Sequence, residues 1–168
     1  MTTIIVLSAE LAGLSDAHNF ERMSQLDGKL LAMLLRSEIQ GYRRVTGRYR
    51  GTSEQAFLVE IDYRSSRQTN SGVALAKLAV EYGQESILAI DVDGRAALIF
   101  CTGERKGEVE VLGVWQRFDP FAIGDEPEAY TIDNGQYWLA GPPLPLTVVN
   151  VPYDEAWASY HCALPGYN

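Results

Sequence analysis

Two hydrophobic periodicities alternate along the first hundred residues of the chain. Residues 4–7 are continuously apolar, and this run predicts a buried strand over residues 4–8. Between residues 19 and 39 the apolar positions recur at helical spacing, and this predicts a helix about 30 Å long, because each residue adds about 1.5 Å. Gly41 is expected to end that helix. The apolar stripe on the predicted helix consists of Phe20, Met23, Leu26, Leu30, Leu34 and Leu35.

Two strands are predicted after this helix, over residues 43–49 and 55–62. In the second strand, large apolar residues occupy every other position. Phe57, Val59 and Ile61 would therefore face one side of a sheet, and the residues between them would face the other side.

A second helix is predicted over residues 71–82, where apolar positions follow the i, i+3, i+4 and i+7 spacing. Residues 86–91 and 95–102 are predicted to be two further strands, and an Asp-Gly pair between them indicates a hairpin. Residues 108–115 alternate again and predict an edge strand.

The order of these elements is β-α-β-β-α-β-β, which predicts an α+β fold. We expect a ferredoxin-like β-α-β-β-α-β sandwich with extra antiparallel strands and an irregular C-terminal tail. Residues 1–116 would form this domain, and residues 117–168 would form a C-terminal extension packed on the domain or on a neighbouring subunit. Within the extension, residues 130–133 and 136–139 are expected to pair around an Asn-Gly turn.

Composition narrows the class of protein. The 168 residues are 46% hydrophobic and 21% charged, as expected of one globular domain with a real core. The formal net charge of −8 argues against a nucleic-acid partner, and we interpret the basic residues between 43 and 50 as a solvated strand face. No apolar stretch approaches the roughly 20 residues of a membrane span, so no membrane partner is expected. The two cysteines, Cys101 and Cys162, make no disulfide framework, and a cytoplasmic location is expected.

Several kinds of catalytic site are not supported by the sequence. The only two histidines, His18 and His161, are far apart in the chain, and no CxxC or HExxH spacing occurs, so no metal site is predicted. No G-x-S-x-G elbow indicates a hydrolytic triad. No G-x-G-x-x-G follows a strand, as it would in a nucleotide-dependent oxidoreductase or a Rossmann-type methyltransferase.

Polar residues at the junctions between elements are the remaining candidates. Asn19 and Arg22 lie one turn apart at the start of the first helix and therefore share a face. Glu54 stands where a loop meets a strand, a common location for catalytic residues, and we take it as the centre of the site. Gln84 lies between the second helix and the next strand. Each also has an ordinary structural interpretation, as a cap, a surface charge, a turn carboxylate or a loop amide.

Together these positions form a pattern of spacing and residue type. The pattern consists of Ser8-Ala9, Asn19-x-x-Arg22, Gly47-x-Tyr49, Glu54 before a strand, and Ala74-x-x-x-Leu78-Ala79-x-x-Tyr82-x-Gln84-x-x-x-Leu88. It resembles the bacteriophage S-adenosylmethionine lyases, small enzymes long described as S-adenosylmethionine hydrolases. The similarity extends from about residue 4 to residue 100 and returns at residues 131–133 and Trp138.

The resemblance implies a ferredoxin-like fold, homo-oligomers with the trimer favoured, and active sites at subunit interfaces. It implies breakdown of S-adenosylmethionine to 5′-methylthioadenosine and homoserine lactone without a metal or cofactor, which depletes the methyl donor and counters host restriction and modification. Glu54 falls at the family's essential glutamate and Gln84 at a functionally important glutamine, so both are predicted to be catalytic. The predicted substrate-binding residues, with the aromatic ones as candidates for stacking on adenine, are Ser8, Asn19, Arg22, Tyr42, Tyr49 and Phe57.

The chemistry of this substrate makes few demands on a protein. The sulfonium is a good leaving group and the substrate's own carboxylate can attack the γ-carbon, so geometry is the main requirement. We favour Glu54 as a positioning residue that binds the amino group or the ribose hydroxyls, because attraction to the sulfonium alone would be lost as its charge is lost. Water as the nucleophile, and hence hydrolysis, stays open. Two other classes also stay open: a non-catalytic acidic phage protein that binds or inhibits a host enzyme, and a bacterial domain of this fold without lyase activity.

Overall fold

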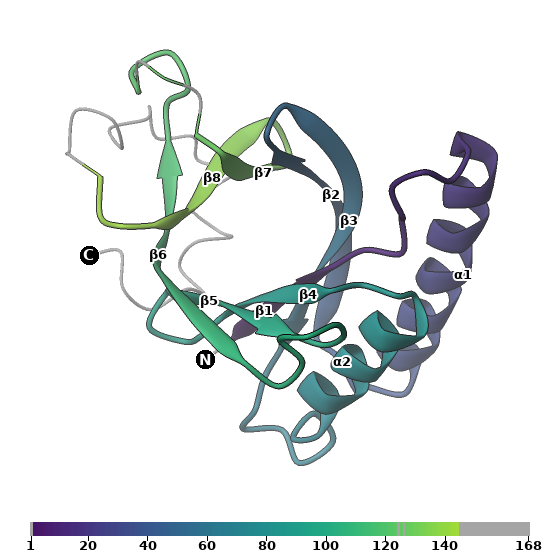
Figure 1. The fold of residues 1–168 in the computed structure, drawn as a ribbon. Coiled ribbons are helices and arrows are strands. Elements are labelled where there is room, and N and C mark those ends of the chain that lie inside the picture. Colours follow the sequence, from purple (N-terminus) through teal and green to yellow (C-terminus); the bar gives the residue numbers. More distant parts are fainter. Residues whose placement is uncertain (1, 124, 126, 145–168) are drawn as a thin grey trace.

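A computed structural model describes residues 2–123, 125 and 127–144 of the chain. In this part of the chain, eight strands close into a barrel in the order β1-β3-β2-β7-β8-β6-β5-β4, with all neighbours antiparallel (Figure 1). The helices are α1 (Asp16–Leu35) and α2 (Ser71–Glu81). The strands are β1 (Thr3–Leu7), β2 (Gly41–Tyr49), β3 (Thr52–Ile61), β4 (Ser86–Ile90), β5 (Arg95–Phe100), β6 (Val109–Phe118), β7 (Ala129–Asp133) and β8 (Gln136–Gly141).

Both helices pack on one outer side of the barrel, against β1, β3 and β4 (Figure 1). The alternation along β3 has the predicted sense. Phe57, Val59 and Ile61 belong to the core beneath the helices, whereas Leu58 faces the inside of the barrel. One strand therefore contributes to two separate hydrophobic cores, because successive side chains of a strand point to opposite faces.

Helix α1 begins and ends earlier than the predicted range of residues 19–39. Ser15 caps its start, since the Ser15 hydroxyl accepts a hydrogen bond from the His18 N–H. At the other end Ser37 has a left-handed φ of 58°, and its N–H donates to the Leu34 carbonyl. A left-handed residue directs the chain away from the helix axis, so the helix ends there rather than at Gly41.

The buried stripe of α1 also differs at both ends from the predicted one. Phe20 is 67% exposed and Leu35 is 78% exposed, so neither belongs to the core. The residues of α1 that are buried are Met23, Leu26, Leu30 and Met33.

The inside of the barrel is filled with apolar side chains over part of its length. Trp115 of β6 and Trp138 of β8 stack with ring centroids 5.5 Å apart and planes 9° apart. Ile4, Leu58 and Ile90 pack with them from the other side of the barrel. Ala56 and Trp115 of this core also line the cavity at one end of the barrel.

Strand β6 is not the predicted edge strand. Its first half pairs with β5, and from Val114 onward it pairs with β8. The register on β5 shifts at a bulge next to Gly113, which has a φ of 133°. A Cβ at Gly113 would lie 2.1 Å from the carbonyl oxygen of Gly141, so a side chain cannot be placed there without moving one of the strands. The glycine thus permits β6 to contact both neighbours and the barrel to close.

The predicted α+β class is confirmed, and closure of the sheet is a feature that the sequence did not indicate. β7 and β8 are strands of the same barrel, although they lie beyond residue 116, where the extension was expected to begin. The predicted turn between them is present, with Asn134 and Gly135 at φ values of 48° and 77°. Residues 145–168, including His161 and Cys162, lie outside the described part of the chain. None of the helices described is long and apolar enough to cross a membrane.

Candidate active site

A cavity of about 900 Å³ occupies one end of the barrel, and all eight strands contribute to its lining. Along β1 and β3, the inward-facing side chains change from apolar to polar toward this end of the barrel. On β1 they run from the buried Ile4 through Val6 to Ser8, just beyond the strand, and on β3 from Leu58 to Glu54. The cavity therefore has an apolar floor and a polar rim, a form typical of small-molecule sites.

Glu54 lies on the rim, near the start of β3 and opposite Gly47 of β2. Solvent reaches Glu54, yet the surrounding walls still remove part of its hydration, and this desolvation raises the pKa of its carboxyl above the ordinary value. The negative charge of Glu10 raises that pKa further, while the polar Ser8 side chain opposes the shift. Glu54 is thus a carboxylate held in a partly dry environment next to another carboxylate.

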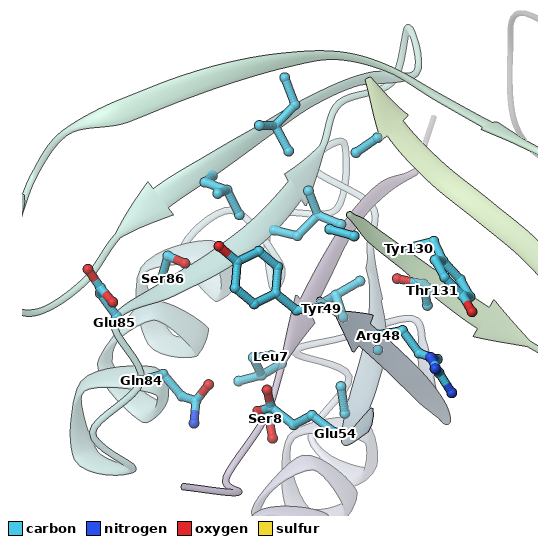
Figure 2. A pocket seen from close by; sticks show the side chains of 18 of the residues that line it. Leu7, Ser8, Arg48, Tyr49, Glu54, Gln84, Glu85, Ser86, Tyr130 and Thr131 are labelled. Carbon is cyan, nitrogen blue, oxygen red and sulfur yellow. The ribbon is translucent and has the colours of Figure 1, made fainter. Parts of the chain in front are cut away.

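Gln84 is fixed by the way in which α2 ends. The Gln84 N–H donates to the Ala79 carbonyl and the Gly83 N–H donates to the Val80 carbonyl, with Gly83 at a left-handed φ of 67°. This arrangement is a Schellman motif, which satisfies the last carbonyls of the helix. The side-chain amide of Gln84 donates to the Glu10 carbonyl over 2.7 Å, and the amide oxygen points toward the cavity (Figure 2).

Aromatic and charged side chains complete the rim. Figure 2 shows the Tyr49 ring in the opening of the cavity, with Ser8, Glu54 and Gln84 on one side and Arg48, Tyr130 and Thr131 on the other. The charged residues that line the cavity are four glutamates and two arginines, a formal charge of −2, namely Arg48, Glu54, Glu85, Arg105, Glu110 and Glu128.

The side chain of Arg105 is held by ion pairs and by a contact with an aromatic ring. Its guanidinium pairs with Glu108 and Glu110 at 2.8 Å each and lies 3.8 Å above the centroid of the Phe100 ring. These contacts neutralise much of the charge of both Arg105 and Glu110, and Glu128 pairs with Arg50 in the same way. Glu54 and Glu85 are the other two glutamates of the lining, and they favour a cationic ligand over an anionic one.

Four of the eight predicted site residues line this cavity: Ser8, Tyr49, Glu54 and Gln84. Asn19 and Arg22 are not in the lining and instead hold the loop between β1 and α1. Asn19 exchanges two hydrogen bonds with the backbone of Leu11, and Arg22 donates to the carbonyls of Ala9 and Tyr82.

Tyr42 and Phe57 lie on the helix side of the sheet, away from the cavity. Phe57 is fully buried, and the two rings meet edge to face with centroids 5.7 Å apart. The Tyr42 hydroxyl donates to the Asp27 carboxylate over 2.8 Å. Burial, together with the nearby Asp27 carboxylate, raises the pKa of Tyr42 to about 12.

Sequence analysis missed the contributions of Glu10, Arg105 and Glu110, whereas Glu85 stands beside Gln84 at the same junction between elements. Arg105 and Glu110 lie beyond β5, in a region that was predicted to end in an edge strand, and only closure of the barrel brings them to the cavity. Glu10 follows Ser8 by two residues, but nothing in its neighbourhood in the sequence signals that it contacts β3. Among the described residues, no group of three histidine, cysteine, aspartate or glutamate side chains could hold a metal ion.

A family model described as the S-adenosylmethionine lyase family matches residues 5–141, well over half of the chain. The chain belongs to the S-adenosylmethionine lyase family. It is an enzyme that acts on S-adenosylmethionine, a lyase. The matched range begins within β1 and ends at the last residue of β8, so it includes β2 to β8 in full and every residue of the cavity lining. No curated protein matches the chain.

Proposed function

We propose that this lyase converts S-adenosylmethionine to 5′-methylthioadenosine and homoserine lactone inside the barrel cavity. A carboxylate oxygen of the substrate attacks its own γ-carbon, and the bond from the γ-carbon to sulfur breaks. The electron pair of that bond goes to sulfur, which becomes a neutral thioether. No water is consumed and no proton has to move, so the protein supplies geometry and electrostatics.

The observation that supports this proposal best is the shared position of Glu54 and Gln84 on the rim of one cavity of suitable size and charge. A volume of about 900 Å³ lies within the range of roughly 300–1,000 Å³ that is usual for small-molecule sites. S-adenosylmethionine has a sulfonium, an ammonium and a carboxylate, so its net charge is positive. The excess of glutamates over arginines in the lining complements that charge.

Glu54 acts on the ammonium group in this account. A carboxylate about 4 Å from a cation gains about 4 kcal/mol at an effective dielectric constant near 20. If Glu54 bound only the sulfonium, this gain would disappear as the sulfur became neutral, and it would slow the reaction. The ammonium keeps its charge throughout, so binding it holds the amino-acid end of the substrate in place without penalising the transition state.

Gln84 supplies a second fixed contact to the same end of the substrate. Its amide nitrogen donates a hydrogen bond to the backbone carbonyl of Glu10. This bond orients the amide oxygen as an acceptor for an ammonium hydrogen. Two fixed acceptors can hold the substrate chain folded, with its carboxylate next to the γ-carbon. Pre-organisation of this kind contributes up to roughly 7–11 kcal/mol in favourable cases. The apolar floor, which includes Val6, Leu88 and Leu98, keeps water from the reacting carbon.

The roles of Glu54 and Gln84 are tested by kinetics of Glu54→Gln and Gln84→Ala, with Glu21→Gln on the exposed surface of α1 as the matched control. We expect kcat/KM for S-adenosylmethionine to fall by about 100-fold or more in the two cavity variants, which corresponds to about 2.7 kcal/mol, and to stay unchanged in the control. Wild-type rates in both cavity variants would overturn the proposed site.

The nucleophile is tested by turnover in water enriched in ¹⁸O. Attack by water on the γ-carbon would place the label in the hydroxyl group of homoserine. Attack by the substrate carboxylate gives an unlabelled lactone, and later opening of the lactone at its carbonyl places the label in the carboxylate only. We expect the hydroxyl to contain no label. Labelled hydroxyl from the earliest time points would mean that the enzyme is a hydrolase.

The biological setting is proposed on the resemblance to the phage enzymes. Removal of S-adenosylmethionine in the cytoplasm would deplete the methyl donor of the host and so counter restriction and modification. We also propose a trimer with active sites at its interfaces. Exposed apolar residues on α1, such as Phe20 and Leu35, support an association of this kind.

A ferredoxin-like core is also part of the proposal. The barrel contains the consecutive strands β4-β1-β3-β2, all antiparallel, and both helices pack on one face of this unit. That strand order with two crossover helices supports a split β-α-β arrangement, to which β5–β8 add the strands that close the barrel.

A further inference from the structure

We propose that Glu10 is a positioning residue of this active site, which holds Glu54 and Gln84 in their places on the rim of the cavity. The inference rests on the proposed function of those two residues. Glu10 lies in the loop between β1 and α1, and each of its polar groups contacts a different part of the site.

The first set of contacts fixes β3 next to Glu54. Backbone pairing between β1 and β3 ends at Leu7 and Phe57. Beyond this point side chains continue the ladder: the Gln55 N–H donates to the Glu10 carboxylate over 2.8 Å, and the Ser8 hydroxyl donates to the Gln55 carbonyl over 2.6 Å. Both backbone groups of the residue that follows Glu54 are therefore held by the β1–α1 loop.

The second set of contacts fixes Gln84. The backbone carbonyl of Glu10 accepts the hydrogen bond from the Gln84 amide over 2.7 Å, and the Glu10 N–H donates to the Ser8 hydroxyl oxygen over 3.0 Å. A shift of Glu10 would thus move Glu54 and Gln84 relative to each other. Because the reaction depends on a near-attack geometry, a displacement of about 1 Å can cost about 100-fold in rate.

Glu10 also acts on Glu54 through its charge. It is the carboxylate that contributes to the raised pKa of Glu54, after desolvation. The other charged groups around the cavity are Arg48 on β2, Glu85 before β4, Arg105 between β5 and β6, Glu110 on β6, and Glu128 before β7. None of them is among the causes of this shift. Neutralising Glu10 is therefore expected to lower the pKa of Glu54 while the desolvation remains.

Two variants separate these roles. Glu10→Gln keeps an oxygen that can accept the Gln55 N–H but removes the charge. We expect its kcat at the pH plateau to stay within about threefold of wild type, and the acid limb of its kcat/KM profile to move to lower pH. Glu10→Ala removes the acceptor as well, and we expect its kcat to fall by about 10- to 100-fold, with a smaller change in KM. Glu21→Ala on α1 is the control.

A direct titration makes the test independent of turnover. The ¹³C shift of the Glu54 carboxyl is followed against pH by NMR in wild type and in Glu10→Gln, and the apparent pKa is expected to fall in the variant. Thermal melting establishes that Glu10→Ala is folded. Wild-type kcat in a folded Glu10→Ala, or an unchanged Glu54 titration in Glu10→Gln, would overturn the proposal. Absence of turnover by the wild-type protein would instead overturn the proposed function, and the titration would still decide the effect of Glu10 on Glu54.

Discussion

At the scale of single residues, the proposed role of Glu54 in activity comes at a cost in stability. Its pKa is raised in the folded protein, mainly by desolvation. The folded state therefore binds a proton at Glu54 more tightly than the unfolded state does. The stabilising effect of that proton is fully present below the ordinary pKa of a glutamate and is lost as pH rises through the folded pKa. At neutral pH the ionised Glu54 destabilises the fold.

Glu54→Gln is accordingly expected to melt at a higher temperature than the wild type at about pH 7, although it loses activity. The advantage should shrink or vanish below about pH 4, where the wild-type carboxyl is protonated. Thermal melting of both proteins at the two pH values measures this. A variant that melts lower than the wild type at neutral pH would contradict the account of the Glu54 environment.

Tyr42 was predicted to bind substrate, and the structure offers a test of whether it does. Its hydroxyl is bonded to Asp27 on the helix side of the sheet, and burial raises the pKa of the phenol to about 12. Tyr42→Phe should lower the free energy of unfolding by about 1–2 kcal/mol, because it removes a hydrogen bond to a charged group. It should leave KM for S-adenosylmethionine unchanged. Denaturant unfolding and steady-state kinetics measure the two effects, and a raised KM with unchanged stability would support contact with the substrate instead.

At the scale of secondary-structure elements, signals confined to a few neighbouring residues were predictive. The Asn134-Gly135 turn, the alternation along β3 and the end of α2 at Gly83 all follow from local backbone preferences. The end of α1 did not, because a serine occupies the left-handed position at residue 37 where glycine is usual. The candidate site shows the same division. Ser8, Glu54 and Gln84 end or begin elements and reach the cavity, whereas Arg22 contacts the loop that positions them.

Gly113 permits the close contact between β6 and the end of β8 that accompanies closure of the barrel. Gly113→Ala is expected to destabilise the protein by about 2–3 kcal/mol, because its φ of 133° and the contact with the Gly141 carbonyl both exclude a side chain. Gly28→Ala is the matched control, since nothing lies within 4 Å of a Cβ at that exposed helical position. It should raise stability by about 0.5–1 kcal/mol. Chemical denaturation measures both changes, and equal effects of the two substitutions would contradict this role of Gly113.

At the scale of the whole molecule, the closed barrel could not be derived from the sequence. Closure depends on pairing between β2 and β7, which are about 80 residues apart in the chain. It also depends on a bulge in β6, and in the sequence that bulge is marked only by a glycine within an alternating strand. Without closure, Arg105, Glu110 and Tyr130 could not be assigned to the same cavity as Glu54. The acidic character of the chain, by contrast, was evident from composition. Its role can be interpreted only once the substrate is identified as a cation.

The net charge of −8 and the acidic cavity lining predict that association with S-adenosylmethionine weakens with salt. The Debye length falls from about 10 Å at 0.1 M salt to about 3 Å at 1 M salt, so KM should rise over this range while kcat changes little. Glu85→Gln removes one carboxylate of the lining and should reduce the salt dependence. A KM that does not respond to salt in either protein would contradict electrostatic attraction of the substrate.

Lactone formation by this lyase is expected to depend on Glu54. The decisive measurement is to mix S-adenosylmethionine with the wild-type protein and with Glu54→Gln and to follow the products by NMR from the first minutes. We predict that the wild type forms 5′-methylthioadenosine together with homoserine lactone before any homoserine appears, and that Glu54→Gln forms neither at a comparable rate. Homoserine without a preceding lactone would mean hydrolysis, and equal turnover by both proteins would contradict the role of Glu54. Absence of turnover by the wild type would contradict the proposed reaction and favour an acidic protein that acts by binding.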